Sequence, residues 1–206
     1  MVNINNVYQT VLVITNKDNR GYITPDEFNR LAEQAQNEIF ASYFAKDVNY
    51  ELNAFVSSDF SDPTTYLAEK INVFYKSSDL TLANGIFTYP DDLYRVGVIS
   101  VDGKVADRAS HEEIKYINLS PLTYPVKTQP VYTLGDLGIK VYPDTITTDV
   151  KADYLKKPIR PKWGYVLQGT VPYYDPTVFD PATDSYNTPA KSYNFELHPS
   201  EENNLV

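Results

Sequence analysis

A helix start at residues 24–27 constrains the fold of this chain most strongly. Thr24 offers a hydroxyl at the N-cap, Pro25 takes the first helical position, and Glu27 stands three residues after the cap, which is the spacing of a capping box. Apolar side chains then keep to one helical face for about five turns; they are Phe28, Leu31, Ala32, Ala35, Ile39, Phe40, Tyr43 and Phe44. We predict a long amphipathic helix with this face in the core. The opposite face, expected to meet solvent or a partner, carries Asn29, Arg30, Glu33, Gln34 and Gln36.

Two further helices are predicted in the first third of the chain. One includes a stripe of apolar residues at spacings of three and four, although the run 11–14 fits a strand equally well; the stripe is Ile4, Val7, Val11 and Ile14. The other begins at Pro63, with Asp62 as its cap. Its inward side chains are expected to be Leu67, Ile71 and Phe74.

From about Leu80 the pattern changes to short alternating runs bounded by turn residues, which predicts strands. Asp102 and Gly103 give a two-residue hairpin signal, and a four-residue turn joins the third run to the fourth. The predicted strands are 96–101, 104–108, 131–134, 139–142 and 150–155. A second capping box, from Ser110 to Glu113, opens a short helix between them. We therefore expect a small antiparallel sheet.

The predicted fold class is α+β, with a helical bundle portion and a small antiparallel sheet domain carrying a long hairpin or arm. We expect four segments: a helical region at 1–79, a sheet region with a short helix at 80–164, a projecting hairpin or arm at 165–197, and the start of a C-terminal helix at 198–206. The flanks 165–167 and 193–197 are expected to pair. A final helix capped by Ser200 is too short to be stable alone, so it is expected to be clipped or to order against a neighbour.

Composition removes several classes of function. The 206 residues carry a net charge of −9, which gives no broad attraction for nucleic acid or anionic lipid. Cysteine is absent, so the chain has no thiol for thiolate chemistry. His111 and His198 stand far apart in the sequence, which makes a histidine metal site an unfavourable interpretation. The longest apolar run is far shorter than the roughly 20 residues that span a bilayer. We expect no membrane, cofactor or metal partner.

The best metal candidate is a stretch laid out like a calcium loop at residues 16–27. Asn16, Asp18, Gly21 and Glu27 stand where such a loop needs oxygen ligands or a tight turn. Arg20 stands where a further oxygen ligand is required, and its fixed positive charge opposes a divalent cation. The same residues are explained by a turn at Gly21 and the capping box of the next helix. We therefore favour the structural interpretation.

Catalytic motifs are missing from the sequence. The acidic pairs Asp91-Asp92 and Glu112-Glu113 are adjacent, so in a regular helix they do not face each other, and we interpret both as first-turn acids near helix dipoles. Phosphate-binding glycine motifs and the Gly-x-Ser-x-Gly elbow are absent. No catalytic residue is expected.

Several runs along the chain resemble virion structural proteins of tailed phages that infect Bacteroidetes, including the crAss-like group. The N-terminal signature is NKDNRGYITPDEFNRLAEQAQ at 16–36 followed by EIF at 38–40. The later runs are YPDDLYR at 89–95, SHEE at 110–113, PLTYP at 121–125, QPVY at 129–132, VYP at 141–143, YLKKP at 154–158, PKWGY at 161–165 and FELHPSEE at 195–202. The resemblance covers nearly the whole chain.

The resemblance implies a neck component of the virion: a ring or adaptor subunit below the portal, twelve per ring, that joins head to tail and surrounds the DNA channel. Its implied partners are copies of itself, the portal and other neck or tail proteins, with DNA only as passing cargo. Localisation in the virion, after assembly in the host cytoplasm, is implied as well. An acidic surface suits this role, because like charge keeps the duplex from adhering to the wall.

Interface residues are the candidate functional residues of such a protein. We expect the arm at 172–191 to contact an adjacent subunit or ring through Tyr173, Tyr174, Phe179 and Tyr186, although it is also compatible with a loop packed on its own domain. Arginines expected to pair with carboxylates across subunits, or to be ordinary solvated charges, are Arg20, Arg30 and Arg160. The alternative functions are a calcium- or carbohydrate-binding module on a Tyr-rich sheet and a hydrolase with dispersed carboxylates.

Overall fold

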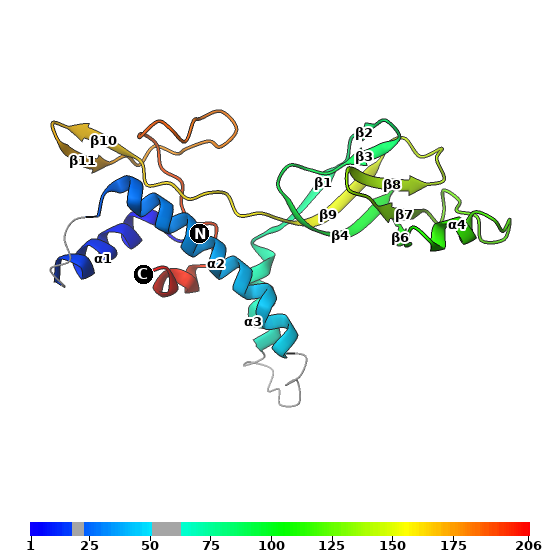
Figure 1. Ribbon diagram of the computed structural model, residues 1–206, viewed down its shortest axis with the longest axis horizontal. Coiled ribbons are helices and arrows are strands. Elements are labelled where there is room, and N and C mark those ends of the chain that lie inside the picture. The colour runs from blue at the N-terminus through cyan, green and yellow to red at the C-terminus, as the bar shows by residue number, and fades with distance from the viewer. Residues whose placement is uncertain (18–22, 51–62) are drawn as a thin grey trace. The chain divides into compact units, whose positions relative to one another are not determined.

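In a computed structural model of the protein (Figure 1), helices and mainly antiparallel strands form an α+β fold, as predicted. The structure describes residues 1–17, 23–50 and 63–206. The chain forms two compact units: Met1–Val73 with Pro158–Val206, called the helical unit here, and Phe74–Lys157, called the sheet unit. This differs from the four consecutive segments expected, because the last part of the chain returns to the N-terminal helices.

The helical unit contains the three predicted helices: α1 (Ile4–Lys17), α2 (Pro25–Tyr50) and α3 (Pro63–Asn72). The capping box of α2 is confirmed, since the Thr24 amide donates to the Glu27 carboxylate at 3.0 Å and the Glu27 amide donates to the Thr24 hydroxyl at 3.3 Å. Asp62, the expected cap of α3, lies outside the described residues. The local sequence signal therefore locates where α2 begins.

The two faces of α2 differ from the prediction at two positions. Leu31, expected in the core, is 55% exposed, whereas Gln36, expected on the polar face, is fully buried. The Gln36 side chain donates to the Ile159 carbonyl at 2.8 Å and accepts from the Glu196 amide at 3.0 Å. Its burial follows from these bonds, because the returning C-terminal segment packs on what the sequence marks as a polar face.

Asn29 binds the same returning segment about two turns earlier on α2. Its side chain accepts from the Trp163 amide at 2.7 Å and donates to the Trp163 carbonyl at 3.2 Å. An amide side chain can satisfy both backbone groups of a residue in this way. Asn29 and Gln36 therefore fix the register between α2 and residues 159–163.

The chain ends in a 3₁₀ helix, η1 (Pro199–Leu205), that packs within the helical unit. Its cap is His198, whose ring accepts from the Ser200 amide, and not Ser200 as predicted. Glu201 forms an ion pair with Lys70 of α3, and Leu205 is buried. The short helix is thus held by the chain's own α3 and its apolar surroundings.

The sheet unit contains two sheets where one was predicted. The four-stranded sheet has the order β1-β9-β4-β5; its strands are β1 (Tyr75–Asp79), β9 (Val150–Lys156), β4 (Leu93–Val101) and β5 (Lys104–Val105). The five-stranded sheet has the order β2-β3-β8-β7-β6; its strands are β2 (Leu82–Ala83), β3 (Ile86–Thr88), β8 (Gly138–Tyr142), β7 (Val131–Leu134) and β6 (Asp107–Arg108). Side chains such as Ile99, Ala152, Phe87 and Ile139, drawn from both sheets, share one core.

The turn at Asp102 and Gly103 forms the predicted hairpin between β4 and β5. Both residues have positive φ, 49° and 73°, as a type I′ turn requires. The pair β6 and β7 is parallel, which the sequence pattern did not predict. In the sequence, α4 (Glu113–Ile117) follows β6 and precedes β7. The second capping box opens this helix, since the Ser110 amide donates to the Glu113 carboxylate at 2.7 Å.

The last hairpin pairs differently from the prediction. β10 (Tyr165–Gln168) pairs with β11 (Val171–Tyr174), and not with residues 193–197. A tight turn at Gly169, with φ of 68°, folds β11 back at once. Residues 193–197 instead bridge to Lys162 and Val2.

In the described part of the chain, no helix is both long and apolar enough to cross a membrane.

Candidate functional site

The hairpin β10–β11 presents one packed face and one exposed face. Tyr165 and Tyr174 are cross-strand partners whose rings both lie 5.9 Å from that of Trp163. Val166 and Tyr173 are the next pair, and both are about half exposed. Of the two predicted contact tyrosines on this hairpin, Tyr173 is therefore accessible, whereas Tyr174 packs against Trp163.

A groove of about 530 Å³ lies between this hairpin and α1. The Trp163 ring packs 4.2 Å from that of Tyr8, and its indole N–H donates to the side chain of Asn5 at 3.1 Å. Residues of the hairpin and α1 complete the lining, including Leu12, Val171 and Tyr173. None of the lining residues carries a charge. We call this the hairpin groove.

Residues 175–191, the larger part of the arm expected at 172–191, are folded back within the helical unit. Phe179 is 1% exposed, which contradicts its expected role as an exposed contact residue. Its ring lies 4.5 Å from that of Tyr186, which is half-buried. Phe179 and Tyr186 therefore pack within their own unit, which agrees with the alternative prediction of a loop packed on its own domain.

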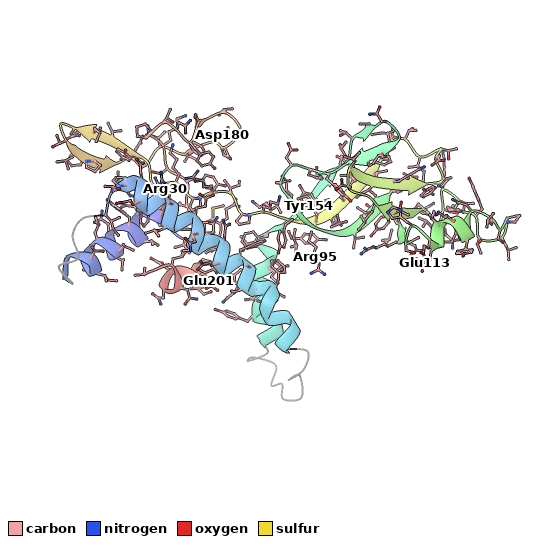
Figure 2. All side chains as sticks on the ribbon, viewed as in Figure 1. Arg30, Arg95, Glu113, Tyr154, Asp180 and Glu201 are labelled. Atoms are coloured by element: carbon pink, nitrogen blue, oxygen red, sulfur yellow. The ribbon has the colours of Figure 1, made fainter. Side chains whose placement is uncertain are left out.

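Lysine and aspartate side chains organise this segment from within. The buried Lys162 ammonium donates to the carbonyls of Thr188 and Ala190 at 2.6 and 2.9 Å, and burial lowers the pKa of Lys162. Asp184 accepts from the Asp180 amide at 2.9 Å; Asp180 itself lies in the loop after β11 (Figure 2). The aspartates of the loop thus accept hydrogen bonds that stabilise its conformation.

The three predicted arginines have separate surroundings. Arg160 forms an ion pair of 2.9 Å with Glu33 of the same chain, and its guanidinium lies 5.4 Å from the Tyr186 ring centroid. Arg30 is exposed on α2 (Figure 2). Arg20 lies outside the described residues. The structure therefore gives Arg160 a partner within its own chain.

A second apolar surface, which the sequence patterns did not mark, lies after α4 in the sheet unit. Leu119 and Leu122 are 79% and 96% exposed, and the Tyr124 side chain is half exposed. Turn hydrogen bonds from the Thr123 and Tyr124 amides to the Ser120 carbonyl, at 3.2 and 3.0 Å, fix the backbone. We call residues 118–126 the α4 loop. The only signal for it in the sequence was apolar residues between prolines, without a helical or strand period.

Asp92 was predicted to be a first-turn acid of a helix. In the structure its carboxylate instead holds strands together. No helix follows Asp92, because it forms a turn with Asp91 before β4. Its carboxylate accepts from the Lys76 ammonium and from the Tyr154 hydroxyl, both at 2.7 Å (Figure 2 labels Tyr154). Burial alone would raise the pKa of Asp92, but these two donors lower it. The cluster therefore has a structural explanation.

Glu201, which Figure 2 labels, forms with Lys70 the most buried ion pair among the described side chains of the helical unit. Burial alone would raise its pKa, but hydrogen bonds from Lys70 and Asn204 and the Lys70 charge hold it below the ordinary value of 4.5. A carboxyl with a lower pKa in the folded state stabilises the fold above its unfolded pKa. This stabilisation is lost as the pH falls through the folded value.

We predict that η1 loosens in acid because of this pair. Below about pH 4.5, the η1 amides should exchange with solvent faster than those of α1, measured by hydrogen exchange at each pH. Glu201→Gln should remove this part of the pH dependence and cost about 1–3 kcal/mol at neutral pH, because Lys70 loses its partner. The control Glu202→Gln, at an exposed neighbour, should change neither. Equal acid loosening in Glu201→Gln and the parent protein would contradict the assignment.

The described residues contain no group of three histidine, aspartate or glutamate side chains arranged for a metal ion. Asp18, Arg20 and Gly21 of the calcium-like stretch lie outside those residues. Glu27, its expected bidentate ligand, is bound to Thr24 in the capping box. A groove of about 630 Å³ beside α4 includes Asp107 and Glu113, but the Ser110 amide holds the Glu113 carboxylate and lowers its pKa.

Comparisons with known proteins assign no family, because no family model and no curated protein matches the chain.

Proposed function

We propose that the protein is a structural subunit of a tailed-phage virion that forms a homo-oligomeric ring in the neck between portal and tail, around the DNA channel. The observation that carries the proposal is the presence of two unlike apolar surfaces, one on each unit: the hairpin groove with Tyr173, and the α4 loop with Leu122. Large exposed apolar patches mark interaction sites in soluble proteins.

Two unlike surfaces on one chain favour ring assembly. When one surface of a subunit binds a different surface of the next, the contact is heterologous, and a suitable rotation closes it into a ring. A symmetric dimer would need only one self-complementary patch. The resemblance of the chain's motif runs to phage virion proteins implies a neck ring of twelve copies, with the portal and other neck or tail proteins as further partners.

The charge of the chain supports the proposed place around DNA. A net charge of −9 repels a phosphate backbone, so the duplex can pass without binding the wall. Free nucleic acid is cargo in this proposal and not a ligand. The protein would act in the virion, after assembly in the host cytoplasm.

Catalysis by dispersed carboxylates has weaker support. Glycoside hydrolysis uses a pair of carboxyl groups, one of them kept protonated by a raised pKa. The pKa values of Asp92, Asp175, Asp184, Glu113 and Glu201 are all lowered by their donors. These groups are suited to hold structure.

The proposal is tested by the mass of the native assembly. Native mass spectrometry and sedimentation over a micromolar concentration series should show a closed oligomer of about twelve copies, alone or on addition of the portal. Calorimetry with calcium and with a glycan panel should show no heat of binding. A monomer that persists with and without portal, or saturable calcium or glycan binding, would contradict the ring proposal.

A further inference from the structure

We infer that the α4 loop of one copy inserts into the hairpin groove of the next copy, so that each subunit contributes one partner of a head-to-tail contact. This inference rests on the proposed function, because it names the two surfaces that would join neighbouring subunits. Leu122, the most exposed apolar side chain of the loop, is the inserting side chain, and Tyr173 and Val171 form the exposed rim of the groove.

The groove is suited to an uncharged, apolar occupant. Its wall combines the Trp163 and Tyr8 rings with Leu12, and its rim offers polar groups at Gln9 and Thr170 without a formal charge. Aromatic anchors with a few uncharged polar groups are typical of protein contact surfaces. A volume of about 530 Å³ lies in the range of binding pockets, roughly 300–1,000 Å³.

The loop has the matching chemistry. Residues 118–126 contain no charged side chain, in a chain with 45 charged ones counted as 18 basic plus 27 acidic. The Leu122 side chain is 96% exposed and gains free energy when another surface covers it. Its backbone is fixed in turns by the Ser120 carbonyl, and the Thr123 hydroxyl donates to the Ile117 carbonyl at 3.0 Å. Such pre-organisation lowers the entropy cost of binding.

Charge decides between this contact and the alternatives. Two copies of a chain with a charge of −9 repel each other, so a contact between copies is favoured where neither surface is charged. The hairpin groove meets this condition, whereas the groove lined by α1, α2 and the end of η1 includes Glu38. On the other partner, residues 118–126 carry no charge, while Asp107, Arg108 and Glu113 lie along the groove that Leu122 and Tyr124 also line. Because the two neutral surfaces are unlike, their contact is heterologous and can repeat around a ring.

Introduced cysteines test the contact directly, because the chain has none of its own. Leu122→Cys and Val171→Cys are prepared as two separate full-length proteins, mixed, and oxidised gently. Since each protein carries one thiol, a disulfide between positions 122 and 171 joins two copies by necessity. We expect this heterodimer, identified by peptide mass, at a yield at least about tenfold above that of Leu122→Cys mixed with Glu202→Cys, an exposed position outside the groove.

The disulfide products and the native mass together distinguish three outcomes. Homodimers of Leu122→Cys or of Val171→Cys in place of the heterodimer would show a symmetric contact and overturn the inference. A heterodimer yield no higher than the control, in a protein that still assembles by native mass, would overturn the inference and leave the proposed ring intact. Failure of both assembly and cross-linking would overturn the two proposals together.

Trp163 provides a second readout, because it is the only tryptophan and lies in the groove. A peptide of residues 117–127, added to the dilute full-length protein, should shift or quench its fluorescence in a saturable way. The same peptide with Leu122→Asp should produce at least about a tenfold weaker response, because a charge would enter an uncharged site. Equal responses to both peptides would count against insertion of Leu122.

Discussion

Replacing Trp163 by alanine is expected to lower the free energy of unfolding of the helical unit by about 3–5 kcal/mol. The Trp163 side chain is 2% exposed and touches the Tyr8, Tyr165 and Tyr174 rings. Its removal leaves a large cavity between α1 and the hairpin and removes the partner of Asn5. This ranks among the largest losses that a single truncation can cause in the unit.

Hydrogen exchange measured separately for the two units is the appropriate experiment. Amides of α1, α2 and β10–β11 should lose protection in Trp163→Ala, while those of the sheet unit keep it, because the two units have separate cores. Trp163→Phe, which keeps an aromatic ring but not the indole N–H, should cost about 1–2 kcal/mol. A loss below about 1 kcal/mol for Trp163→Ala would show that Trp163 does not organise this unit.

The starts of α2 and α4 and the first hairpin could be predicted because their causes are local. Thr24 and Glu27 bond each other across three residues, and Asp102 with Gly103 adopts positive φ at the turn itself. Each signal is complete within a few positions of sequence. Nothing elsewhere in the chain is needed for it to act.

The course of residues 158–206 could not be predicted, because it depends on contacts distant in sequence. Gln36 belongs to the polar face of α2 by pattern, yet its partners Ile159 and Glu196 lie 123 and 160 positions away. Phe179 reads as an exposed arm residue, yet Lys162 and Tyr186 enclose it. Polarity alone does not reveal which polar side chain will be buried by a chain segment that returns from far along the sequence.

The candidate surfaces were predicted only in part, for a related reason. Tyr173 was identified because Tyr-rich extended segments are typical of contacts, and it is exposed. The α4 loop escaped prediction, since Leu119 and Leu122 follow no period that separates core from surface. Their exposure results from the turn at Ser120, whose effect on Leu122 is visible only in three dimensions.

Gly164→Ala is expected to release the segment 175–191 from the helical unit, at a cost of about 3 kcal/mol, the upper part of the usual range for overpacking. A Cβ at this position would lie 2.1 Å from the Lys191 carbonyl oxygen and 2.4 Å from its carbon. Both are backbone atoms, so no side chain can rotate away to make room. The backbones of 164 and 191 must separate.

Separation would break the hydrogen bonds that close the segment. The Gly164 amide donates to the Ser192 hydroxyl at 2.9 Å, and the Asp175 amide donates to the Gly164 carbonyl at the same distance. Phe179 should then become accessible, and limited proteolysis should cut within 175–191 at protease concentrations that leave the parent protein intact. The melting temperature of the helical unit should also fall in Gly164→Ala.

Gly169→Ala separates this packing effect from the general effect of a new side chain. Gly169 has φ of 68° and no atom within 4 Å of an added Cβ, so the substitution strains the turn by about 1 kcal/mol and meets no neighbour. It should lower the melting temperature slightly and leave the segment resistant to protease. If Gly164→Ala behaves like Gly169→Ala, the close approach of residues 164 and 191 does not hold the segment in place. Cleavage in Gly164→Ala alone would identify that approach as the contact on which the folded-back segment depends.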